Sequence, residues 1–89
     1  MGTLEQAMEA VELKSRNENA RFYCRMAYSS AVHTLRRHEL RGNREAVIVA
    51  EGLADRIRRV YDALGGGRDE LAQIAKETRA EAEKAHERG

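Results

Sequence analysis

The sequence predicts an all-α protein, built as an antiparallel helical hairpin followed by a third helix. The chain contains no proline and only four aromatic residues, and Ala, Glu, Arg and Leu dominate it, which is typical of long helices. Apolar residues recur at three- and four-residue spacing along most of its length. Two glycine-containing breaks, RGN at 41–43 and GGG at 65–67, separate three such segments. We therefore expect a single domain over 1–89, a three-helix bundle whose thin core oligomerisation could complete.

The first helix is predicted at about 3–41, because Thr3 followed by Gln6 fits a capping box. Gly42 suits the left-handed conformation that ends a helix and Asn43 is a preferred N-cap, so the two flanking helices should be antiparallel neighbours. An unbroken first helix would be about 58 Å long, nearly twice the second. The segment KSRNEN at 14–19 is the weak point of this helix, since Ser and Asn compete for backbone hydrogen bonds, and the sequence leaves open whether the helix continues through it or kinks there.

The second helix, predicted at 44–64, has one broad apolar face that we assign to the core, whereas Ile48 points the other way. This face contains Val49, Ala50, Leu53, Ala54, Ile57, Val60, Tyr61 and Leu64. The third helix, predicted at 69–87, follows the glycines and opens with acidic residues at its positive end. Its apolar face is narrow and mostly alanine, so its burial contributes little free energy. That face contains Leu71, Ile74, Ala75, Ala82 and Ala85.

The first helix carries two apolar stripes, and the second helix can cover only one of them. The first stripe consists of Leu13, Ala20, Cys24, Ala27, Tyr28, Ala31 and Leu35. The second, roughly 140° around the helix, consists of Leu4, Met8, Val11, Phe22, Met26 and Leu40. Either the third helix covers this second stripe or another molecule does, and we favour a homo-oligomer or a helical protein partner. The predicted protein interface is Met8, Val11, Phe22, Met26, Leu40 and Ile48.

Positive charge is concentrated in residues 16–44, where seven arginines outnumber two glutamates. Arg36, Arg37, Arg41 and Arg44 gather at the hairpin end, and nucleic-acid binding through these four is the alternative function, since guanidinium groups bind phosphate well. Arg21 and Arg25 lie farther from the turn. In an antiparallel hairpin with this turn, two residues face each other when their numbers sum to about 85, so these arginines lie opposite an acidic side of the second helix. We expect a salt-bridged seam there, with Arg25 near Asp62.

The polar and reactive residues give no catalytic or metal-binding pattern, so we expect no cofactor and no metal and favour a non-enzymatic protein. The lone Cys24 can form no internal disulfide and is expected to pack between helices, which favours a reducing compartment and hence the cytoplasm. His33 and His38 are expected to be packing residues. The one Glu-x-x-His, Glu83 to His86, is too few for a di-metal bundle. Without an apolar run of about 20 residues, no membrane partner is expected.

Two partial resemblances accompany these patterns. SAVHTLRR, a tight turn and REAVIVAEGLADRIRRVYDAL, together residues 30–64, resemble the N-terminal helical hairpin of translin-type nucleic-acid-binding proteins. The length, the helix order and the Arg44-Glu45 pair in NREA resemble the helical chorismate mutase, which implies a pocket lined by Arg21, Arg25, Arg36 and Glu45. The chain departs from the first pattern after the glycines and from the second in having no cation in residues 1–13. We assign it to neither family, and mutase-type enzyme activity ranks third.

Overall fold

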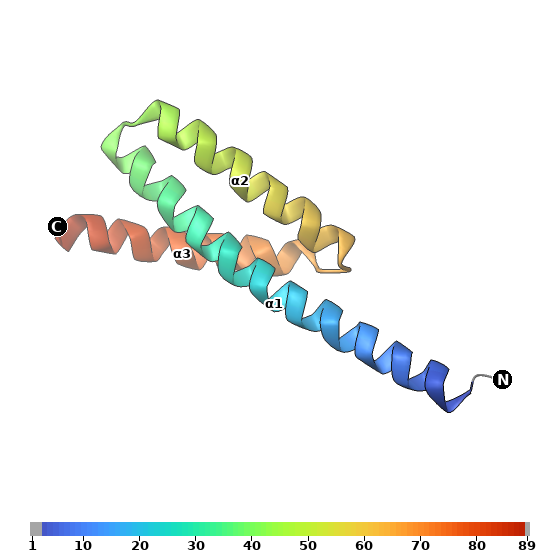
Figure 1. Ribbon diagram of the computed structural model, residues 1–89. Helices are drawn as coiled ribbons and strands as arrows, with labels where there is room; N and C mark the ends of the chain where they lie inside the picture. The colour runs from blue at the N-terminus through green and yellow to red at the C-terminus, as the bar shows by residue number, and fades with distance from the viewer. Residues whose placement is uncertain (1–2, 89) are drawn as a thin grey trace.

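The computed structural model describes residues 3–88, which form three helices: α1 (Leu4–Arg41), α2 (Arg44–Ala63) and α3 (Arg68–Arg88). α1 and α2 pair as the predicted antiparallel hairpin, and α3 packs across α1 (Figure 1) while contacting α2 far less. The all-α class and the hairpin are confirmed, and each helix end lies within one residue of its predicted position. The molecule is elongated, 59 × 24 × 18 Å, because α1 is much longer than its neighbours.

α1 begins at the predicted capping box. The backbone N–H of Gln6 donates to Thr3 Oγ1 (3.3 Å), and the backbone N–H of Thr3 donates to Gln6 Oε1 (3.0 Å). The helix then continues through 14–19 without a break. Ser15 and Asn19 are exposed there, and such residues lower helix stability only by tenths of a kcal/mol each, about 0.5 on average.

The turn between α1 and α2 has the predicted chemistry. Gly42 adopts a left-handed conformation (φ 73°) and its N–H donates to the Glu39 carbonyl. The Asn43 N–H donates to the His38 carbonyl at 3.0 Å, while its side chain accepts the Ala46 N–H at 3.2 Å. Asn43 therefore closes one helix and opens the next, which forces the two into antiparallel contact.

α2 ends in a second left-handed turn, which directs α3 back towards α1. Gly65 has a φ of 80°, and the Gly66 N–H donates to the Tyr61 carbonyl at 2.9 Å. Gly66 lies directly against the Tyr61 ring, so that a Cβ at this position would overlap the ring carbons. The chain therefore passes Tyr61 closely before Leu71 of α3 reaches the core.

The core is small and lies where α1 meets both other helices. It consists of Tyr28, Ala31, Val32, Ala54, Tyr61 and Leu71. The prediction that the whole apolar face of α2 is buried is wrong, because Val49, Leu53 and Val60 are 73%, 50% and 52% exposed. α3 covers α1 rather than α2, so the outer half of that face has no neighbour.

Candidate interaction surface

The N-terminal part of α1 extends beyond both other helices, and we call residues 4–19 the arm. Figure 1 shows it leaving the bundle with no helix beside it. The hairpin register explains this, because Arg21 lies at the end of α2 and its Nη1 donates to the Leu64 carbonyl (2.7 Å). α1 has 38 residues and α2 has 20, so the residues before Arg21 pass the end of their partner.

One face of α1 carries large apolar side chains that the rest of residues 3–88 leaves at least half exposed. This open stripe consists of Leu4 (79% exposed), Met8 (57%), Val11 (68%), Phe22 (51%) and Met26 (57%). It ends where α3 crosses α1: Ser29 Oγ and Thr78 Oγ1 are hydrogen-bonded at 3.1 Å, and His33 is half-buried beside Ala82. The open stripe therefore runs from the start of α1 to Met26.

Phe22 is held in place on the open stripe by its neighbours on α1. The Tyr23 ring meets it edge-on with centroids 5.7 Å apart, and the Arg25 guanidinium lies 6.0 Å from its centroid. Arg25 is itself fixed, since its Nη1 donates to Tyr61 Oη at 3.3 Å. Edge-on rings and a cation near a ring are favourable contacts, so Phe22 presents a partly ordered apolar surface.

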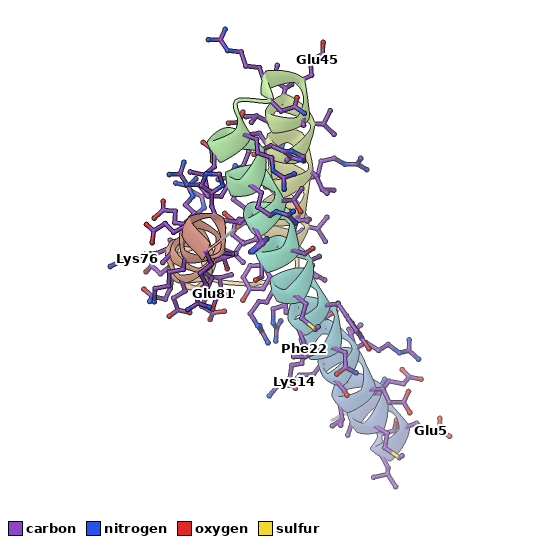
Figure 2. All side chains as sticks on the ribbon, turned by 90° about the vertical axis from the view of Figure 1, so that its left-hand side faces the viewer. Glu5, Lys14, Phe22, Glu45, Lys76 and Glu81 are labelled. Atoms are coloured by element: carbon purple, nitrogen blue, oxygen red, sulfur yellow. The ribbon has the colours of Figure 1, made fainter. Side chains whose placement is uncertain are left out.

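The six predicted interface residues fall into two groups. Met8, Val11, Phe22 and Met26 lie on the open stripe, with Phe22 and the arm visible in Figure 2. Leu40 is half-buried near the hairpin turn, about 21 Å along α1 from Met26. Ile48 is 69% exposed on α2, in a shallow hollow with Val47 and Arg44. The structure does not bring these last two together with the other four.

The predicted ion pair between Arg25 and Asp62 is wrong, although the register behind it is right. Arg25 bonds to the Tyr61 hydroxyl, which donates to Glu70 of α3. Arg21 donates to the Leu64 carbonyl, since the last carbonyls of a helix lack hydrogen-bond donors within the helix and attract cations. On α2, Asp55 pairs within its own helix with Arg58 (3.2 Å) and Arg59 (2.8 Å).

The arginines at the hairpin end are separated by the fold. Arg36 pairs with Glu83 of α3 at 2.9 Å and lies 4.0 Å from Glu39. Arg37 and Arg41 are exposed and line a pocket of about 420 Å³ between α1 and α3, whose other lining residues are His33, Ala82, Ala85 and His86. Arg44 lies apart from it, beyond the turn. The sequence patterns did not place the two histidines beside these arginines, although His33, Arg37 and Arg41 follow one another at helical spacing.

A second apolar surface was also missed, because its residues on α2 had been assigned to the core. It is a groove of about 470 Å³ between α1 and α2, on the side of the hairpin that α3 leaves open. Figure 2 shows α3 end-on, to one side of the hairpin. The groove is lined by Ala27, Ser30, Ala31, Thr34, Val49, Ala50, Leu53 and Ile57.

The four residues of a mutase-like pocket do not converge. Arg21 and Arg25 bond to the end of α2, whereas Glu45 lies at its start, at the opposite end of the hairpin in Figure 2. Cys24 is half-buried against the core. Within 3–88, no three His, Cys, Asp or Glu side chains are grouped as metal ligands would be, and none of the helices is long and apolar enough to cross a membrane.

Comparison with known protein families, with curated proteins and with solved structures finds no match to this chain.

Proposed function

We propose that this protein acts by association, with a second copy of itself or with another helical protein, through the open stripe of α1. The observation that carries the proposal is the exposure of five large apolar side chains along one face of a helix without a neighbour. Contiguous apolar surface rimmed by charge is typical of protein contact sites. A helix with such a face binds by laying it into a groove or against another helix.

The two remaining predicted interface residues lie outside the open stripe and contribute less to this contact. Leu40 is half-buried and Ile48 stands alone on α2, so any contact through them is separate from the open stripe. Burial of Met8, Val11, Phe22 and Met26 is the mechanism, since the gain in free energy scales with the apolar area removed from water.

Light scattering on a sizing column, at low and at high salt, tests the proposal. We expect a dimer or larger species that persists at high salt, because apolar contacts are not screened by ions. The double variant Phe22→Gln/Met26→Gln should be monomeric. The matched control Val49→Gln/Leu53→Gln alters residues of the α1–α2 groove that are also at least half exposed and should keep the wild-type mass. A wild-type monomer at every concentration that also captures no helical partner would overturn the proposal, as would an unchanged mass in the first variant.

A second candidate, nucleic-acid binding, is favoured by the pocket that Arg37 and Arg41 share with His33 and His86, because no carboxylate lines it. Fluorescence anisotropy with labelled single-stranded RNA and double-stranded DNA tests it over a salt series. Binding by the pocket requires an affinity that falls steeply with salt and drops in Arg37→Gln/Arg41→Gln. The control Arg58→Gln/Arg59→Gln removes equal charge from α2 and should bind like the wild type. Absence of binding at low salt rejects this candidate.

A further inference from the structure

We propose that the occupant of the open stripe is a second copy of this chain and that the two α1 helices pair antiparallel, with Ser15 at the two-fold axis. The inference rests on the proposed function and adds the partner, its orientation and its register. In this register, residues whose numbers sum to about 30 face each other across the seam. Met8 then lies opposite the partner's Phe22, Leu4 opposite Met26, and Val11 opposite Asn19.

The extent of the open stripe determines this register. It begins with Leu4 at the start of α1 and ends at Met26, because α3 crosses α1 at Ser29 and His33. Two such stripes overlap over their whole length only when their midpoints coincide, and the midpoint is Ser15. A shift in either direction would drive one arm into the partner's α3 or leave apolar side chains uncovered.

The spacing of the seam fits the same register. Residues on this face occur at intervals of four, three and four, which repeats every 11 residues along the chain. The seam positions are Leu4, Met8, Val11, Ser15, Asn19, Phe22 and Met26. Read backwards from Met26 to Leu4, the intervals are the same, so every seam position meets a seam position of the antiparallel partner. A period of about 3.67 residues is close to that of a straight helix, so α1 can pair without strong supercoiling.

Charge selects the antiparallel orientation over the parallel one. Residues 4–13 contain three acidic residues and no cation, a charge of −3: Glu5, Glu9 and Glu12. Residues 14–26 contain four cations and one acidic residue, a charge of +3: Lys14, Arg16, Arg21, Arg25 and Glu18. Antiparallel pairing sets each half beside the opposite charge, whereas parallel pairing sets like beside like, which is unfavourable.

Two pairs of flanking residues add to this near the two-fold axis. Lys14 and Glu18 lie on one flank of the stripe. There Lys14 faces the partner's Glu18, and Glu18 faces the partner's Lys14. Glu12 and Arg16 lie on the opposite flank and meet in the same way. In an antiparallel pair, like flanks face each other, so both contacts bring together opposite charges.

Such a partner would also stabilise the helical arm. Isolated helices shorter than about 12–15 residues are marginal in water, and the 16-residue arm is only slightly longer, with two like-charged neighbours, Glu5 and Glu9, one turn apart. Pairing would supply the missing tertiary contacts. The helical signal in circular dichroism is therefore expected to rise with protein concentration as dimers form.

Disulfide cross-linking in a Cys24→Ala background tests the register, with diamide as the oxidant and light scattering to confirm that each variant still associates. We expect Ser15→Cys to form covalent dimers, because the two residues meet at the axis within disulfide reach. Met8→Cys alone should not cross-link, since the two copies lie about 21 Å apart. The double variant Met8→Cys/Phe22→Cys should link efficiently.

The outcomes separate this inference from the proposed function. A monomer by light scattering removes the association itself. An associated species in which Met8→Cys links alone indicates parallel pairing and overturns the orientation. An associated species in which Ser15→Cys does not cross-link overturns the register. It would indicate that the two copies meet through another surface, such as the α1–α2 groove. A dimer that is weaker in Lys14→Glu and restored in Lys14→Glu/Glu18→Lys would confirm the flanking pair, and an equal dimer Kd in both would reject it.

Discussion

Replacing Gly66 with alanine tests the turn that sends α3 across α1 and thereby leaves the open stripe uncovered. The new Cβ would overlap three carbons of the Tyr61 ring. Tyr61 is only 1% exposed and packs in the core with Tyr28 and Leu71, so a shift of its ring would disturb core contacts. Either the ring moves and loses these contacts, or the turn opens and the Gly66 N–H bond to the Tyr61 carbonyl is weakened.

The magnitude follows from these contacts. Overpacking a filled core costs about 1–3 kcal/mol. For a chain of this length each kcal/mol lowers the melting temperature by about 4–8 °C, so we expect Gly66→Ala to melt about 4–24 °C below the wild type. Thermal and urea unfolding followed by circular dichroism measures this, at one fixed protein concentration because association would itself shift the transition.

A second glycine supplies the matched control. Gly52 lies within α2 and a Cβ there would meet no atom within 4 Å. Gly52→Ala should therefore gain about 1 kcal/mol from helix propensity and melt higher than the wild type. The same substitution thus has opposite expected signs at two positions. A Gly66→Ala protein that melts at or above the wild-type temperature would refute the close approach of the turn to Tyr61.

Further substitutions test the packing and the interface. Leu71→Ala should lower the free energy of unfolding by about 2–5 kcal/mol in urea titrations, because Leu71 is 3% exposed, whereas Val60→Ala at a 52% exposed site should cost under about 1 kcal/mol. Thr78→Val removes the hydrogen bond to Ser29 and should cost about 1 kcal/mol by the same measurement. Phe22 is half exposed, so two copies gain about 1.5–3 kcal/mol on pairing, and Phe22→Ala should raise the dimer Kd about 10–150-fold in sedimentation equilibrium.

The helix boundaries could be predicted because the signals that set them are local. A capping box needs only residues three apart, as Thr3 and Gln6 show, and a left-handed glycine needs only its own freedom of φ. Gly42 followed by Asn43 even fixes the hairpin, since the turn is too short for any other arrangement. These elements depend on few residues close in sequence, so tertiary packing does not override them.

The position of α3 could not be predicted in this way. An apolar face indicates which side of a helix tends to be buried, but it does not indicate which other helix packs against that side. The helical pattern predicts that the whole apolar face of α2 is buried, whereas Val49 and Leu53 remain exposed because α3 lies across α1. The grouping of Leu40 and Ile48 with the open stripe fails for a similar reason. A helical wheel shows direction around an axis and omits distance along it.

The size of the core and the size of the exposed apolar surface together favour association. Of the nine buried apolar residues within 3–88, four are alanines, whereas eleven large apolar side chains there are at least half exposed. A single copy therefore leaves much apolar surface in contact with water, and the open stripe holds five of these eleven exposed side chains along one face of α1. The charges on either side of Lys14 contribute orientation more than strength, because exposed pairs are weak and are screened by salt. High salt should therefore leave the proposed dimer intact while it weakens the electrostatic preference for the antiparallel pair, and the packing of the seam side chains must then hold the orientation alone. Met8→Cys cross-linking that stays absent at high salt would indicate that the apolar seam is sufficient for this.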